Sequence, residues 1–266
     1  VYITDGSVTA VAPDPVSSAN FDTNAGANST IRPSDIVALL NDGTAVVLQA
    51  NNDITVTDAV MANSDSSALF ALNAGRSINI NNSIDTGNGS FAAYAGDASA
   101  QAGQRDAGDS TITLAAGTTI SAGTGTILIA ADNAGNGKGK FVDNAGATPF
   151  SAAQTYIILP SFNTTGPNGV TYATLNGLTV NNKRYGATED LIASLTSGVN
   201  LFYVAAPTLT VTPTTGQSGT YGATHAPSGA TLSGFVDGDD LTAAGVTGTA
   251  LFTLSGTDNA FGRRNA

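Results

Sequence analysis

The chain has 266 residues, with 9 Lys and Arg against 20 Asp and Glu, which gives a formal net charge of −11. Nucleic acid and anionic membranes would repel such a chain, so we expect neither as a partner. The lack of cysteine excludes disulfides, thiolate metal sites and cysteine nucleophiles, and no apolar run approaches the ~20 residues of a membrane span. Only 11% of the residues are charged, whereas Gly, Asn, Thr and Ser abound, so the composition predicts an all-β protein.

Residues 46–84 contain a repeat with an offset of 24 residues and no gap, in which Leu48 aligns with Leu72 and Ile54 with Ile78. The other aligned pairs are Ala50 with Ala74, Val56 with Ile80 and Val60 with Ile84. A unit of this length is too short for a strand, a crossover helix and a return strand. It suits three short strands and three turns, which is one coil of a parallel β-helix. A meander of hairpins is the alternative, but hairpins do not require a head-to-tail period.

A third copy of the repeat carries an insertion. Residues 111–114 resemble 77–80, and residues 122–126 resemble 86–90. The additional residues include 96–109, which are rich in Ala, Gly, Asp and Gln, and we expect them to form a loop outside the stacked core. Asparagines at the turns are candidates either for amide ladders between coils or for solvated turn positions: Asn51, Asn52, Asn73, Asn79, Asn81 and Asn82.

The pattern weakens after the third copy. Residues 133–154 are expected to be irregular and to cap or interrupt the β-helix, and a strong strand then ends at Pro160. Residues 188–195 are predicted to form the only helix, with acidic residues in its first turn. We therefore place the β-helix over residues 1–204, and a small β-sandwich-like module over 207–266. The chain starts without Met and stops without a closing strand, so we expect it to be part of a longer one.

The runs 45–56 and 72–80 resemble the repeats of filamentous-haemagglutinin-type exoproteins, which are bacterial surface proteins of two-partner secretion. This similarity covers roughly residues 36–132. The run 221–249, with Ser233-Gly234-Phe235-Val236-Asp237-Gly238-Asp239 inside it, resembles the YDG or MBG-type β-modules that often follow such repeats. The secretion-domain motif Asn-Pro-Asn-Gly has no counterpart except Gly166-Pro167-Asn168-Gly169, which reads as a β-turn.

The resemblance implies a right-handed β-helix taken from the body of a larger exoprotein at the bacterial cell surface. It implies a role in adhesion, aggregation or the formation of filaments, matrix or biofilm. The implied partners are other copies of the chain, joined end to end or laterally, and glycans or proteins on host or neighbouring cells. The stalk of a toxin-delivery exoprotein is a further alternative.

Four acids are the best candidates for a pair of catalytic carboxylates, namely Asp97, Asp106, Asp109 and Asp132. A carbohydrate-active β-helix enzyme would need one carboxyl with a raised pKa in a cleft with aromatic platforms. The chain has no Trp, and Tyr94 is the only aromatic residue nearby. Solvated loop acids are therefore the favoured interpretation, and we expect a protein that is not an enzyme and has no catalytic residues.

Three other groups of residues are weaker candidates. Asp237-Gly238-Asp239-Asp240 offers oxygen ligands for Ca²⁺, but it lacks the spacing and the final Glu of an EF-hand loop, and a turn is favoured. His225 is the only histidine and has no second His or Cys with which to bind a metal. Lys183-Arg184 and Arg263-Arg264 are isolated basic pairs. We expect no metal and no cofactor.

Overall fold

The computed structural model describes residues 1–6, 20–22, 28–63, 65–132, 137–164, 169–187, 197–215 and 229–242. Within these ranges the protein is mostly β-structure with one α-helix, and no helix there has the length and apolarity to cross a membrane. The chain divides into two compact units, Val1–Ala206 and Pro207–Ala266.

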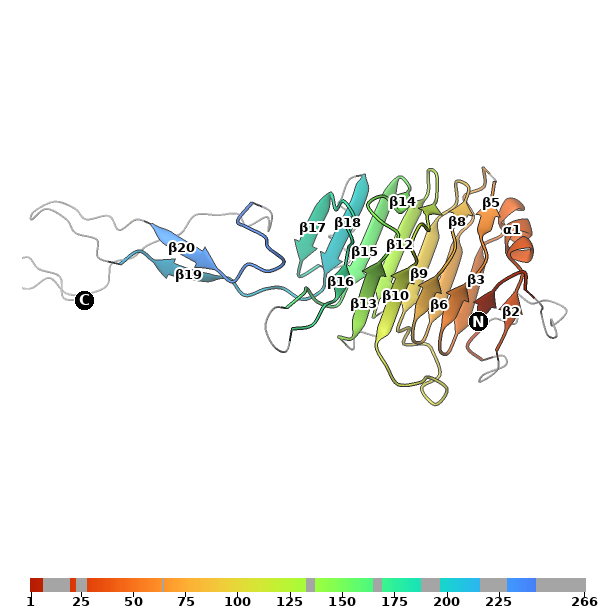
Figure 1. Cartoon of the computed structure of the whole chain (residues 1–266), viewed down its shortest axis with the longest axis horizontal. Helices are drawn as coiled ribbons and strands as arrows, with labels where there is room; N and C mark the ends of the chain where they lie inside the picture. The colour runs from red at the N-terminus through yellow and green to blue at the C-terminus, as the bar shows by residue number, and fades with distance from the viewer. Residues whose placement is uncertain are drawn as a thin grey trace, which may run out of the picture. The chain divides into compact units, whose positions relative to one another are not determined.

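The first unit is built from three parallel sheets, which we name A, B and C (Figure 1). Sheet A contains, in spatial order, β16 (Ala173–Thr174), β13 (Gly139–Asp143), β10 (Ser110–Leu114), β7 (Ile78–Ile80), β4 (Ile54–Val56), β1 (Tyr2–Ile3) and β2 (Thr30–Ile31). Sheet B contains β17 (Asn182–Tyr185), β18 (Gly198–Tyr203), β15 (Gln154–Leu159), β12 (Thr126–Ala131), β9 (Phe91–Ala95), β6 (Phe70–Ala74) and β3 (Val46–Ala50). Sheet C contains β14 (Phe150–Ser151), β11 (Ile120–Ser121), β8 (Ile84–Thr86) and β5 (Val60–Ala62).

From β3 to β14 the chain visits sheets B, A and C repeatedly in that order. One such succession of three strands is termed a round, so that β3, β4 and β5 form the first round and β12, β13 and β14 the fourth. Each strand pairs in parallel with the strand of the preceding round in its own sheet. Every round therefore adds one strand to each sheet.

The register of the strands agrees with the repeat seen in the sequence. Leu48 pairs with Leu72 and Ile54 with Ile78, which confirms the predicted alignment. The third round continues it, because Ile112 pairs with Ile78 in sheet A. The insertion is thus accommodated between strands without a shift in the alternation of inward and outward side chains.

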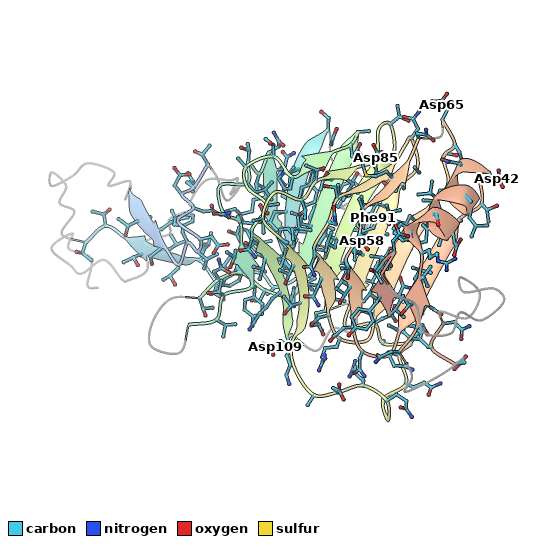
Figure 2. The ribbon with its side chains drawn as sticks, turned by 45° about the vertical axis from the view of Figure 1, so that its right-hand side comes forward. Asp42, Asp58, Asp65, Asp85, Phe91 and Asp109 are labelled. Carbon is cyan, nitrogen blue, oxygen red and sulfur yellow. The ribbon has the colours of Figure 1, made fainter. Side chains whose placement is uncertain are left out.

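The inward positions of successive rounds form buried columns. One column in sheet B consists of Leu48, Leu72, Ala93, Ile129, Ile157 and Leu201. Another in sheet A consists of Ile54, Ile78, Ile112, Phe141 and Ala173. Each fully buried Leu or Ile contributes about 1.5–3 kcal/mol, so these columns hold the sheets together. Figure 2 shows Phe91 among the packed side chains, whereas Asp42, Asp65 and Asp109 lie at the periphery.

Helix α1 (Pro33–Asn41) lies at the end of the sheets where β3 and β5 are the edge strands (Figure 1). Pro33 is suited to the first turn, where its missing N–H has no partner to lose. Ile36 and Leu40 lie one turn apart, and both are buried in the common core. This helix was not among the predicted elements, and the helix predicted over 188–195 falls outside the described residues.

Residues 133–154 were expected to be irregular, and this is wrong for the parts that form β13 and β14. Phe141 is buried in register with Ile112, so β13 continues sheet A. Gly139 is needed there because a Cβ atom on it would lie 2.5 Å from the backbone nitrogen of Asp132. The glycine that suggests an irregular loop instead allows two backbones to approach.

Sheet B ends with an edge strand that reverses the chain order, because β17 precedes β18 in sequence but lies outside it. The register places Lys183 beside Leu201, the last member of a buried column. Tyr185 stacks on Tyr203 with ring centroids 5.2 Å apart, and Phe162 contacts both rings. Aliphatic side chains are thus replaced by a lysine and an aromatic cluster at this edge.

The second unit contains an antiparallel pair of strands, β19 (Thr210–Pro213) and β20 (Ala230–Ser233). Thr210 pairs with Ser233 and Thr212 with Thr231. The side chains of β19 are exposed. A complete β-sandwich-like module remains a prediction.

Candidate binding surface

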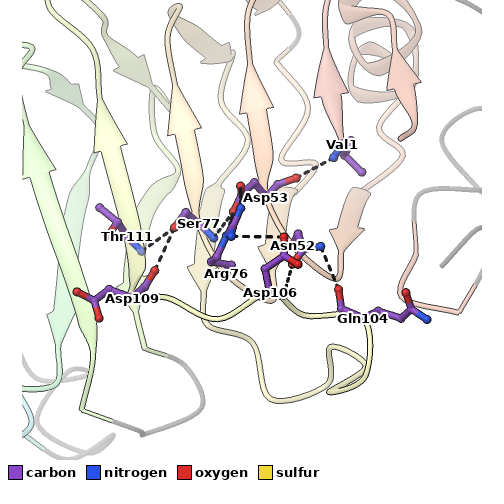
Figure 3. A network of polar contacts seen from close by, with 9 residues as sticks. All are labelled: Val1, Asn52, Asp53, Arg76, Ser77, Gln104, Asp106, Asp109 and Thr111. Atoms are coloured by element: carbon purple, nitrogen blue, oxygen red, sulfur yellow. Dashed lines mark hydrogen bonds and ion pairs between the residues drawn. The ribbon is translucent and has the colours of Figure 1, made fainter. Parts of the chain in front are cut away.

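The insertion of residues 96–109 folds back over the turns that join sheet B to sheet A in the first two rounds (Figure 3). The Asn51 side-chain oxygen accepts a hydrogen bond from the backbone N–H of Gln101 at 2.8 Å. Asn52 makes two bonds, because its Oδ1 accepts from the Asp106 backbone at 2.6 Å and its Nδ2 donates to the Gln104 carbonyl at 3.0 Å. The loop is therefore fixed to the sheets by backbone bonds along its length.

A glycine in the second turn permits this close docking. A Cβ atom on Gly75 would lie 2.2 Å from the backbone oxygen of Asn51 and 2.5 Å from Cβ of Ala100. Ala100 itself is buried. Any larger residue at position 75 would have to push the loop away from the turn.

An ion pair lies beneath the loop. Arg76 donates from Nε and Nη2 to the two carboxylate oxygens of Asp53, at 2.8 and 2.5 Å, and the backbone N–H of Ser77 donates to the same carboxylate at 3.0 Å. Burial opposes ionisation of Asp53, but the hydrogen bonds from Arg76 and Ser77 and the neighbouring positive charges outweigh it, so its pKa is lowered. The backbone nitrogen of Val1 donates to the Asp53 backbone oxygen at 2.7 Å.

The four acids proposed as catalytic candidates have separate partners. Asp106 lies 3.5 Å from Arg76, and Asp109 lies 2.5 Å from the amino group of Lys140. Asp97 accepts from the backbone of Ser99, and Asp132 accepts from the backbone of Gly137. These are the bonds of turn residues and ion pairs. Among the described residues no three His, Cys, Asp or Glu side chains are grouped so as to hold a metal ion.

The acidic run in the second unit forms a turn. Asp237 adopts a left-handed backbone with φ 53°, and the backbone N–H of Asp239 donates to the Val236 carbonyl at 2.9 Å. Asp240 accepts a bond from the Thr242 backbone. Lys183 and Arg184 lie on β17. His225 and the Arg263-Arg264 pair fall outside the described residues.

Sequence reasoning missed the residues that dock the loop. Asn51 and Asn52 were candidates for amide ladders, but their side chains bind the loop, and Asn51 also donates to the Phe21 carbonyl at 2.9 Å. Arg76 was not singled out at all. The available signal was Asp53 and Arg76, which lie in the equivalent turns of the two rounds before the insertion and so could be expected to form an ion pair.

Asp143 is a second residue that the sequence did not reveal. Its register partner is Leu114, an inward residue, and the whole side chain is 0% exposed. Its Oδ1 accepts backbone bonds from Ala145 and Gly146, whereas its Oδ2 has no partner in the described part of the chain. Burial raises the pKa of this carboxyl.

Comparisons of the chain with protein-family models, with curated proteins and with solved structures find no match. The surface best defined by the geometry described above is the docked loop of residues 96–109, together with the turns beneath it.

Proposed function

We propose that the first unit is a right-handed parallel β-helix and that the protein is an extracellular adhesive protein of a bacterial surface, of the filamentous-haemagglutinin type. The observation that carries this proposal is the docked insertion on a scaffold of parallel rounds. A rigid scaffold that holds a shaped outer loop is suited to recognition, because a preorganised loop loses little entropy on binding.

The properties of the loop support binding rather than chemistry. Its acids are bonded to cations or to backbone groups, and its residues 102–104 and 106–109 are exposed. The exposed stretch presents backbone groups, the amide of Gln104 and the carboxylates of Asp106 and Asp109 at fixed positions. Such a surface can make many weak contacts with a protein or glycan on another cell.

The two ends of the sheets favour lateral contacts over end-to-end assembly. Helix α1 buries Ile36 and Leu40 against the first round, so the helix occupies the place where a further round of a second copy would stack. At the other edge of sheet B, Lys183 on β17 pairs with Leu201, the last residue of the buried column that begins at Leu48. A charge at such a position disfavours the addition of a further strand. We therefore propose that contacts with other surfaces are made along the sides of the sheets.

The test is an adhesion assay with the full chain coated on beads and incubated with bacterial and epithelial cells. We expect beads with the wild-type chain to retain cells, and the double variant Ala102→Arg/Ala107→Arg on the exposed loop to retain at least tenfold fewer. Thr148→Arg is the matched control, since it adds the same side chain at an exposed turn between β13 and β14. Equal retention by all three proteins, or none by the wild type, would overturn the proposal.

A further inference from the structure

The outer face of sheet B carries no charged side chain from β3 to β15, although the chain as a whole has a net charge of −11. Parallel register aligns the outward positions of these five strands in two rows. The first row is Val47, Ala71, Ala92, Leu128 and Tyr156, and the second is Gln49, Asn73, Tyr94, Ala130 and Ile158. We name these ten residues the uncharged face. Val47 is 43% exposed, the larger side chains are half-buried, and the small side chains of Ala71, Ala92 and Ala130 are buried between them.

The size of the uncharged face suits a chain ligand better than a second protein. Five strands about 4.8 Å apart and five residues of about 3.3 Å each give roughly 24 by 17 Å, or about 400 Å². This area lies within the range of about 300–600 Å² found for the largest apolar patches on monomeric proteins, which are often functional. It is about half of the ~800 Å² that each partner buries in a standard protein interface. A second copy of the chain would therefore need further contacts outside this face.

The chemistry of the uncharged face fits a neutral sugar polymer. Aliphatic side chains and tyrosine rings can pack against the apolar faces of sugar rings, while amides and phenols bond to hydroxyl groups. The Oδ1 atom of Asn73 is buried and has no hydrogen-bond partner among the described residues. Because this atom is buried, a sugar hydroxyl reaches it only when the register neighbours Gln49 and Tyr94 turn aside, and the hydroxyl then supplies the missing donor.

Tyr94 is the register neighbour of Asn73 and faces the same side. Burial, and then the charge of Asp97, raises the pKa of its phenol, so the hydroxyl is a neutral donor at physiological pH. An acidic polymer would gain no ion pair on this face and would be repelled by the rest of the chain. The absence of charge thus favours neutral polymers over acidic ones.

We infer that the uncharged face binds an extended neutral polysaccharide, with Gln49, Asn73 and Tyr94 as its row of hydrogen-bonding residues. This inference rests on the proposed adhesive function and names a ligand class for it. The site is distinct from the docked loop, which covers turns and not the face of a sheet.

The test is affinity electrophoresis of the full chain in gels that contain a soluble mixed-linkage β-glucan, a galactomannan or, as the acidic polymer, polygalacturonate. We expect retardation by at least one neutral polymer and none by polygalacturonate. Asn73→Leu keeps the size of the side chain and removes the acceptor, so we expect at least tenfold weaker binding without a loss of thermal stability. Asn79→Leu is the matched control, because Asn79 is half-buried on the outer side of β7 in the same round.

The inference is overturned if neither neutral polymer retards the wild type, or if Asn73→Leu binds as tightly as the wild type. The adhesion assay separates this result from a failure of the proposed function. If the beads retain cells but the protein binds neither neutral polymer, only the ligand class is overturned. If the beads retain no cells and the protein binds neither neutral polymer, both proposals are overturned.

Discussion

Asp53 is half-buried and Asp143 is fully buried, and their surroundings shift the pKa of the two carboxyls in opposite directions. Asp53 is bonded to Arg76 and Ser77, which lowers its pKa. Asp143 occupies an inward position beside Leu114, and its second oxygen is unpaired within the described residues, so burial raises its pKa. The pH dependence of stability should therefore differ in sign between the two residues.

For Asp143→Asn we expect greater stability at neutral pH, by about 1–3 kcal/mol, because a buried carboxylate with one unpaired oxygen is replaced by a neutral amide. A raised folded-state pKa means that the contribution of Asp143 is fully present below about pH 4 and is lost as the pH rises through that pKa. The advantage of the variant should thus vanish near pH 3.5. Urea unfolding at both pH values measures this, with exposed Asp42→Asn as the control; a variant that is less stable at neutral pH would contradict it.

For Asp53→Asn we expect a loss of about 1 kcal/mol at neutral pH, because charge-assisted bonds to Arg76 are weakened. A lowered folded-state pKa means that this contribution is present above about pH 4 and is lost as the pH falls through the folded pKa. The difference from the wild type should therefore shrink on acidification. The same unfolding series measures it, and a deficit that grows towards low pH would refute the assignment.

At this scale the sequence predicts which positions face inward but not which partners the polar residues find. The 24-residue offset aligned Leu48 with Leu72 because aliphatic side chains repeat regularly. Asn51 and Asn52 bind a loop that lies about 50 residues further along the sequence, as the hydrogen bond from the Asp106 backbone to Asn52 shows. No local pattern encodes such a contact.

Among the elements, α1 carries signals that a search for strand periodicity passes over. Pro33 stands in its first turn with Asp35, and Gly43, with φ 80°, directly follows the C-cap residue Asp42. Ile36 and Leu40 have the spacing of one helical face. A helix of nine residues is stabilised mainly by what it covers, and its site against β5 and β3 is not visible in the sequence.

We expect Ile36→Ala to lower the free energy of unfolding by about 2–5 kcal/mol, because the residue is fully buried and leaves a cavity. Ser34→Ala on the exposed side of α1 should change it by less than about 0.5 kcal/mol. Chemical denaturation of both variants gives the comparison. If the two substitutions had equal effects, α1 would not be part of the core.

The loop gives a second prediction at the scale of elements. Gly75→Ala should loosen residues 96–109, because the new Cβ would overlap the Asn51 carbonyl and Ala100. Limited trypsin digestion should then cleave after Arg105 at least several times faster than in the wild type. Gly103→Ala is the control, since a Cβ there would meet no atom within 4 Å. Unchanged cleavage after Arg105 in Gly75→Ala would mean that the loop is not held by this contact.

At the scale of the whole first unit, the register of the first three rounds was predictable, because each of them repeats the one before it, whereas β13 and β14 of the fourth round were not predicted. The ends of the unit were not predictable either, because α1 and β17 break the repeat. Lys183 shows why: in the sequence it is one of an isolated basic pair, and only the register with Leu201 places it at the edge of sheet B. Features that stop a repeat have no second copy by which to recognise them.

Lys183→Leu should favour association, because it continues an apolar column to the edge strand and removes a charge that opposes strand addition. Sedimentation velocity over a hundredfold range of concentration should show larger species for this variant than for the wild type. Lys138→Leu makes the same substitution at an exposed position before β13. Equal association of the two variants would show that the edge of β17 is not protected by its lysine.

The succession of rounds also bears on how the chain acquires its structure. Apart from the docked loop, the strands of a round pair only with strands of the rounds beside it, so most of the free energy is a sum of neighbouring terms and folding can spread from one formed end. Once helix α1 and the first round are packed, they form a template, and each later round can fold by pairing its strands with the round before it. A chain delivered with its amino end first would meet its partners in the order in which they emerge, and would not need to wait for distant segments.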